Sequence, residues 1–150
     1  MITNERQYRI TKAEAARFEQ ALAHADEQNK HLHPALQKAA REGLESQLQE
    51  LREQLEKYEA LCAGKETSFL FDSLTNLPEV LIKARIARGF TQKQLADALN
   101  LPEQQIQRYE ATLYKGAALD RIEAVAKALG LRESVRFDLS IPPPIAGVQV

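Results

Sequence analysis

The sequence predicts a mainly α-helical protein, in which an N-terminal helical hairpin or coiled coil at residues 1–63 precedes a compact helical domain at residues 77–131. Two observations support this fold class. Apolar residues recur at alternating intervals of three and four over both halves of the N-terminal region. In residues 77–131, glycine, asparagine and proline separate short apolar segments where helices would end and begin. Residues 64–76 are then a linker, and residues 132–150 a C-terminal strand and proline-rich tail.

The composition is that of an ordinary globular chain, with 44% hydrophobic residues among 150. No run of about 18 apolar residues exists, so we expect no membrane partner. The first six residues, Met-Ile-Thr-Asn-Glu-Arg, have no apolar segment of the kind that secretory signals carry. Cys62 is the only cysteine, which excludes an intramolecular disulfide. We therefore expect a cytoplasmic protein.

The first predicted helix begins at Thr11, which forms a capping box with Glu14. It ends near Asn29. One apolar stripe follows the capping box at helical spacing and consists of Ala15, Phe18, Leu22 and Ala25. The segment from His31 to Pro34 is a predicted turn, because proline disfavours helix in the preceding residue but suits the first position of a new helix.

The second predicted helix runs from Pro34 to about Ala63, where Gly64 can end it in a left-handed conformation. Its apolar residues follow the heptad rhythm of a coiled coil and are Leu44, Leu48, Leu51, Leu55, Tyr58 and Cys62. This stripe is longer than that of the first helix, so a simple hairpin would leave leucines uncovered. A second protomer could cover them, and the alternative is a spacer or packing arm that pairs within one chain.

Two short segments favour β-structure. Phe69, Leu70 and Phe71 form an apolar run, and residues 135–141 alternate apolar with polar side chains. The two could pair across the domain. Three consecutive prolines, Pro142 to Pro144, end any strand and favour an extended tail.

The most informative stretch is residues 90–110, whose pattern predicts two short helices joined by a tight turn. A helix from Pro78 to about Arg88 precedes them, and Gly89 ends it. Thr91 and Gln94 form a capping box at the start of the next helix, which leaves Gln92 exposed at the positive end of the helix dipole, where a phosphate would bind.

Asn100 is suited to the turn because asparagine tolerates the left-handed conformation, and Pro102 then fixes the first position of the second short helix. In that helix Ile106 and Tyr109 face inward, and Gln105 is intermediate. The outward-facing residues are Glu103, Gln104, Gln107 and Arg108. Glutamine can pair with adenine, arginine with guanine, and glutamate can accept from cytosine, so this face has the chemistry that reads bases in a major groove.

Residues 77–131 resemble the Xre/Cro-type, phage-repressor-like helix-turn-helix family. The resemblance rests on the spacing of Thr91, Gln92, Leu95, Ala96, Leu99, Ile106 and Glu110, and on the later segment 119–131 with its terminal Gly130. It implies a domain of about five helices that binds operator double-stranded DNA as a homodimer, usually to repress transcription.

Carried over by position, the resemblance implies that Gln92 contacts phosphate, and we place Lys93 with it. It also implies that Glu103 and Gln104 are the first base-reading residues and Arg108 a later one. Lys115 lies in the loop that usually contacts the DNA backbone. The chain departs from the family pattern at Asn100, Pro102 and Glu103. Glu103 would repel phosphates unless it meets a cytosine amino group or Arg108.

The net charge of −1 is modest for a nucleic-acid partner. Its distribution is uneven, because residues 1–66 carry 10 Lys and Arg against 12 Asp and Glu, whereas residues 77–130 carry 8 against 6. The positive excess therefore lies with the motif. Since it is small, useful affinity would require a dimer, which doubles the phosphate contacts.

Two alternative functions remain open. Within the regulator class, the protein could be an antitoxin that represses its own operon and binds a toxin protein through a separate segment. The alternative from another class is a protein-interaction adaptor that uses the coiled-coil arm and does not bind DNA. We expect no enzyme and no cofactor, because the sequence has neither a phosphate-binding loop nor a nucleophile elbow. His31 and His33 lie at the predicted turn and Cys62 near the far end of the second helix, roughly 40 Å from them at 1.5 Å per helical residue, which is too far to share a metal.

Overall fold

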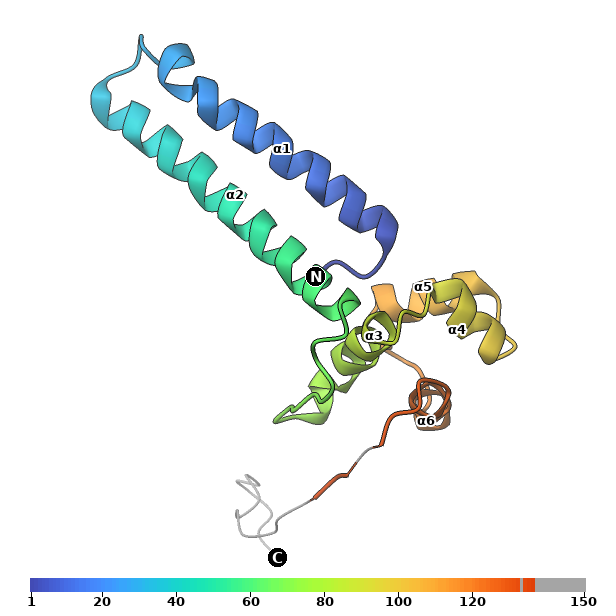
Figure 1. The fold of residues 1–150 in the computed structure, drawn as a ribbon. Helices are drawn as coiled ribbons and strands as arrows, with labels where there is room; N and C mark the ends of the chain where they lie inside the picture. Colours follow the sequence, from blue (N-terminus) through green and yellow to red (C-terminus); the bar gives the residue numbers. More distant parts are fainter. Residues whose placement is uncertain (133, 137–150) are drawn as a thin grey trace, which may run out of the picture.

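The computed structural model describes residues 1–132 and 134–136. These residues form six α-helices and one short 3-10 helix (Figure 1). Helices α1 (Glu5–Gln28) and α2 (Pro34–Cys62) lie side by side as a long pair, which we call the arm. The rest of the fold is a compact cluster at the foot of the arm and consists of η1 (Leu74–Asn76), α3 (Leu77–Ala87), α4 (Gln92–Ala98), α5 (Glu103–Ala111) and α6 (Leu119–Ala128).

Helix α1 begins before the capping box that the sequence suggested. Asn4 is its N-cap, and the Asn4 side chain accepts a hydrogen bond from the backbone N–H of Gln7 at 2.9 Å. The predicted start at Thr11 is therefore wrong. Contacts with the end of α2 hold the earlier turns, because the Tyr8 ring stacks on the Tyr58 ring at 5.3 Å and the Tyr8 hydroxyl donates to Glu59 at 2.6 Å. A local capping signal cannot reveal such tertiary contacts.

The two arm helices are antiparallel. Residues near the start of α1 meet residues near the end of α2, as the Tyr8–Glu59 hydrogen bond shows, and the order reverses along the arm. Glu19 pairs with Arg52 at 2.7 Å, and Asp26 pairs with Arg41 at 3.0 Å near the connecting turn. The predicted extent of α2 is confirmed, including Gly64 at φ +64°.

The apolar stripe of α2 is only partly covered by α1. Leu48 and Tyr58 are buried, whereas Leu44, Leu51 and Leu55 are half-buried. Cys62 is exposed, and the buried side chain at the end of the helix is Leu61, at 4% exposure, so the assignment of Cys62 to the stripe is wrong. Charged residues flank the stripe.

No helix among residues 1–132 is long and apolar enough to cross a membrane.

The cluster of α3 to α6 has a close-packed core. Its fully buried side chains are Leu81, Ile82, Leu95, Ile106 and Val125. The predicted stops are confirmed, with Gly89 at φ +70° and Asn100 at φ +53°. Pro102 serves as the N-cap of α5 at φ −62° and ψ 142°, so the helix proper begins at Glu103, one residue later than predicted.

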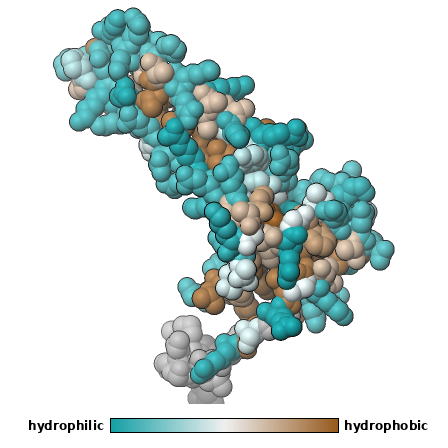
Figure 2. Space-filling model, viewed as in Figure 1, coloured by the Kyte–Doolittle hydropathy of each residue, from teal (hydrophilic) through white to brown (hydrophobic). Residues whose placement is uncertain are grey.

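This core continues into the foot of the arm. Ile2, Tyr58 and Leu61 belong to the same hydrophobic cluster as the side chains of α3 to α6. Figure 2 shows apolar side chains gathered where the arm meets the cluster, whereas hydrophilic side chains cover most of the outer arm. The division of the chain at residues 64–76 stays a prediction, but that segment does not separate two independent cores.

The predicted β-structure and the predicted number of helices are not confirmed. Residues 69–71 are irregular rather than a strand, and residues 135 and 136 are not in a strand either. The remainder of the predicted strand, residues 137–141, and the proline-rich tail lie outside the described residues. Residues 77–131 contain four α-helices, so the count of five that the family resemblance implies is not confirmed.

Candidate nucleic-acid interface

Helices α4 and α5 form the helix-turn-helix. The capping box at the start of α4 is present in full, since the Thr91 hydroxyl accepts from the backbone N–H of Gln94 at 3.0 Å and the Gln94 side chain accepts from the Thr91 N–H at 2.9 Å. In the turn, Leu101 N–H donates to the carbonyl oxygen of Ala96 at 2.9 Å. The first two bonds fix the start of α4, and the third closes its C-terminal end before the turn into α5.

Helix α5 is anchored on one face and open on the other. Ile106 is fully buried and Tyr109 is half-buried, as predicted. The exposed residues of the opposite face are Glu103, Gln104, Gln107 and Arg108. Gln107 Nε2 donates to Glu103 Oε1 at 3.0 Å, and Arg108 Nη2 donates to Gln105 Oε1 at 2.9 Å. All four predicted base-reading side chains are therefore accessible and lie on one face, although their role is not tested.

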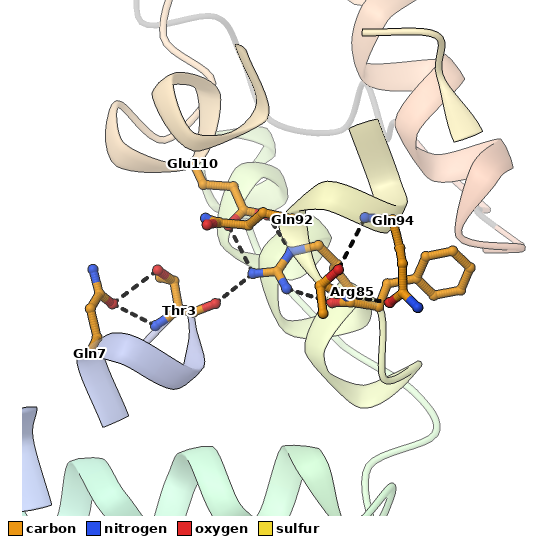
Figure 3. Close-up of polar contacts among 8 residues, drawn as sticks. Thr3, Gln7, Arg85, Gln92, Gln94 and Glu110 are labelled. Carbon is orange, nitrogen blue, oxygen red and sulfur yellow. Dashed lines mark hydrogen bonds and ion pairs between the residues drawn. The ribbon is translucent and has the colours of Figure 1, made fainter. Parts of the chain in front are cut away.

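A buried ion pair lies behind this face and links α3 to α5 (Figure 3). Arg85 Nη2 donates to Glu110 Oε2 at 2.8 Å and Nε donates to Oε1, with side-chain exposures of only 3% and 1%. Arg85 Nη1 also donates to the carbonyl oxygen of Phe90 at 2.7 Å. The bidentate geometry and the additional acceptor compensate for the cost of burying two charges. Glu110 is thereby held in the interior and cannot contact a ligand from α5.

Gln92 joins this buried network. Its side chain is only 9% exposed, and Nε2 donates to Glu110 Oε2 at 2.7 Å. The expectation that the Gln92 side chain is exposed is therefore wrong. The physical reason is that an unsatisfied lone pair of a buried carboxylate is a stronger partner for an amide than water is. The other two predicted phosphate-binding residues are exposed: Lys93, which pairs with Asp97 at 3.3 Å, and Lys115.

The loop that follows α5 carries Lys115 and has an unusual backbone. Leu113 and Tyr114 have φ angles of +50° and +54°, a conformation that costs free energy for residues other than glycine. Packing of Tyr114 compensates, because its ring stacks on Tyr109 at 5.6 Å and is 3% exposed. The Tyr114 hydroxyl has no hydrogen-bond partner among the described residues, and burial raises its pKa. The loop is therefore fixed to α5 rather than freely hinged.

Two members of this network, Arg85 and the carbonyl oxygen of Thr3, were not predicted from the sequence. The signal for Arg85 was a charged residue within the apolar segment Leu81–Ile86, which indicates a buried cation that needs a partner. Thr3 accepts from Arg85 Nη2 at 2.5 Å across 82 residues of sequence (Figure 3), and no local pattern indicates such a contact.

The candidate metal ligands do not meet. His33 is the N-cap of α2 and Cys62 is its last residue, at opposite ends of a helix of 29 residues. Among residues 1–132 and 134–136, no three His, Cys, Asp or Glu side chains are grouped so that they could hold a metal ion.

Residues 81–135, a little over a third of the chain, match the family model described as helix-turn-helix. This segment spans the last seven of the 11 residues of α3 and the whole of α4, α5 and α6. It is similar to Xre/Cro-like helix-turn-helix domains, which are found in DNA-binding regulators. No curated protein and no solved structure matches the chain. The arm thus lies outside the matched segment.

Proposed function

We propose that this protein is a sequence-specific transcriptional repressor that binds operator DNA as a homodimer. The observation that carries the proposal is the accessible polar face of α5, which projects from a helix whose opposite face is fully buried at Ile106. A helix held so firmly can present side chains to the edges of bases without losing its position.

The base-reading set in this proposal is Glu103, Gln104, Gln107 and Arg108. Arg108 would recognise guanine through its two parallel N–H donors, and Gln104 would recognise adenine through its amide. Glu103 would accept from a cytosine amino group. In the absence of DNA, the 3.0 Å hydrogen bond between Gln107 and Glu103 positions both side chains. Gln107 would have to break this bond to reach a base.

The phosphate-binding set in this proposal is Gln92, Lys93 and Lys115. Because the Gln92 side chain is held by Glu110, the simplest contact from this residue is through its backbone N–H at the first position of α4, where the helix dipole favours an anion. Lys93 and Lys115 would contribute charge without sequence information.

The dimer proposal rests on the arm and on charge. Leu44, Leu51 and Leu55 are half-buried because two helices alone cannot enclose a heptad stripe, and a second copy would complete their burial. Dimerisation would also double the small positive excess of residues 77–130. The mass of the full chain in solution, measured by light scattering, tests this step directly.

The binding experiment begins with duplexes selected by the full chain from a random library, followed by mobility-shift titrations at two salt concentrations. Arg108→Ala should weaken binding to the selected site by about 1 to 3 kcal/mol and relax base preference at one position. Lys115→Ala should weaken all duplexes alike and lower the salt dependence by about one phosphate contact.

Lys127→Ala removes the same charge from an exposed lysine in the last turn of α6, outside the helix-turn-helix of α4 and α5, and is the matched control. Equal losses on every duplex for Arg108→Ala would remove this residue from the base-reading set. A full chain that selects no duplex and shows no salt-dependent binding would instead favour an adaptor that uses the arm.

The repressor proposal has an antitoxin variant, in which the chain represses its own operon and also binds a toxin protein. The arm is the candidate toxin-binding segment because it lies outside the helix-turn-helix match. Co-purification with the product of an adjacent gene, and loss of that complex when arm residues are changed, would test this variant separately from DNA binding.

A further inference from the structure

A groove separates the first turns of α1 from the reading helix α5. It has a volume of about 1340 Å³. Arg6 and Arg9 line it on the α1 side, and Glu103 and Gln107 line it on the α5 side. The arm therefore flanks the face of α5 that carries two of the proposed base-reading residues.

Arg6 and Arg9 are free to take a ligand. Both are exposed, and neither forms an ion pair or a hydrogen bond with any residue in the described part of the chain. They are three residues apart in a helix, so they project from neighbouring positions on one face. In contrast, Arg41 and Arg52 of the same arm are used in ion pairs between its helices. The cations that hold the arm together are thus distinct from those at its foot.

The position of these two arginines relative to α5 is fixed. Ile2 is buried in the common core at 3% exposure, and the Thr3 carbonyl oxygen accepts from Arg85, which itself holds Glu110 of α5. The backbone N–H of Thr3 donates to Gln7 Oε1 at 2.8 Å, which ties the chain before α1 to its first turn (Figure 3). The start of α1 is therefore part of the same rigid unit as the reading helix.

The charges of the groove permit an anion to approach the arginines. Four carboxylates line it, but Lys83 neutralises Glu79 at 2.8 Å and Arg85 neutralises Glu110. The negative charges of Glu5 and Glu103 are equal in number to the positive charges of Arg6 and Arg9, so the lining is close to neutral overall. A phosphate that approaches from the α1 side would meet two guanidinium groups one helical turn apart, a donor arrangement that suits the DNA backbone.

We propose that Arg6 and Arg9 bind backbone phosphates of the DNA strand that runs beside α5, so that the arm contributes directly to the nucleic-acid interface. This inference rests on the proposed DNA-binding function and extends its surface beyond the segment that matches the helix-turn-helix family. The arm supplies cations that residues 77–130, with their excess of 8 over 6 charges, largely lack.

The test compares the full chain with the Arg6→Ala/Arg9→Ala variant on one duplex selected by the wild-type protein. Dissociation constants are measured by fluorescence anisotropy between about 50 and about 200 mM KCl. Each lost phosphate contact should lower the slope of log affinity against log salt by about 0.9, so we expect a reduction of about two in each bound protomer. Base preference in a competition with mutated duplexes should not change.

Two further variants make the result specific. Arg17→Ala/Lys38→Ala removes the same charge from exposed positions of the arm that do not line the groove, and it should leave the slope unchanged. Arg6→Lys/Arg9→Lys keeps both charges and should restore most of the slope. Circular dichroism melting of every variant checks that the fold is retained, as expected for exposed side chains whose only ion pair among the described residues, that of Lys38 with Glu42 at 3.7 Å, is itself exposed.

The outcomes separate the two proposals. If the wild-type chain binds its duplex and the Arg6→Ala/Arg9→Ala variant shows the same slope of log affinity against log salt, the role of the arm is overturned and the proposed function stands. Tighter binding by this variant also overturns it, because α1 would then obstruct the DNA. A wild-type chain that binds no duplex overturns both.

Discussion

The arm and the cluster of α3 to α6 are both helical, but they are stabilised in different ways. In the cluster, five large apolar side chains are completely buried and a buried ion pair joins α3 to α5. In the arm, most stripe residues are half-buried, and the ion pairs between its helices are exposed, as for Arg52 and Glu19 at 52% and 51%. The cluster therefore has a unique packing arrangement, whereas the arm retains apolar surface that a second chain can use.

The largest effect should come from breaking the buried pair. Glu110→Gln leaves the Arg85 guanidinium buried without a counter-charge, and the free energy of unfolding should fall by about 3 to 5 kcal/mol. Urea denaturation of the full chain measures it.

Two controls sharpen this contrast with the arm. The double replacement Arg85→Met/Glu110→Leu should be less destabilising than Glu110→Gln, since it removes both charges together. Arg52→Ala, which breaks an exposed pair, should cost less than about 1 kcal/mol. Equal losses for Glu110→Gln and Arg52→Ala would show that the ion pairs of the two regions are energetically alike.

The next effect compares leucine truncations. Leu95→Ala should cost about 2 to 5 kcal/mol, because Leu95 is wholly enclosed and its removal leaves a cavity. Leu51→Ala should cost less than about 2 kcal/mol in the monomer, since Leu51 is half-buried and its site can be reached by solvent. Thermal or urea unfolding at several protein concentrations measures both.

Measurements at several protein concentrations distinguish the contribution of self-association from that of packing within one chain. If the arm dimerises, the loss for Leu51→Ala should grow with protein concentration and that for Leu95→Ala should not. A Leu51→Ala loss as large as that of Leu95→Ala at the lowest concentration would contradict the difference in packing.

The smallest effect concerns the Tyr114 hydroxyl, which is buried without a partner among the described residues. Tyr114→Phe should raise the free energy of unfolding by about 1 kcal/mol at neutral pH, because an unsatisfied hydroxyl is removed. Burial raises the pKa of Tyr114 above the ordinary value of 10.0 in the folded state. The contribution of this hydroxyl to the free energy of unfolding is therefore constant below about pH 10 and falls as the pH rises further, because the hydroxyl ionises more readily in the unfolded chain.

The variant lacks this contribution, so its stability should fall less between about pH 8 and about pH 10.5. Tyr58, whose pKa burial raises to about 12, remains in both proteins and contributes to the residual dependence. Urea midpoints at the two pH values measure the difference, and parallel losses in wild type and variant would contradict it.

The sequence predicted the parts of the fold that depend on short-range chemistry. The Thr91–Gln94 capping box, the left-handed Asn100 and the inward Ile106 are all as expected, because each is determined by residues within one or two helical turns. Long-range contacts determine the features that the sequence did not predict. The early start of α1 depends on Tyr58, and the burial of Gln92 depends on a carboxylate 18 residues away. The exposed face of α5 was predicted, but the arginines opposite it were not, since only the folded chain brings them there.

The contact between Thr3 and Arg85 has a consequence for how the chain folds during synthesis. Helices α1 and α2 leave the ribosome before α3 to α6 exist, so the Thr3 carbonyl oxygen lacks Arg85, and the hydrophobic cluster that includes Ile2 stays incomplete, until those helices have emerged. Completion of the core is therefore a late, long-range closure rather than the addition of one finished domain to another. A shortened chain that lacks the first four residues should unfold faster and aggregate more readily, even though it keeps every helical residue.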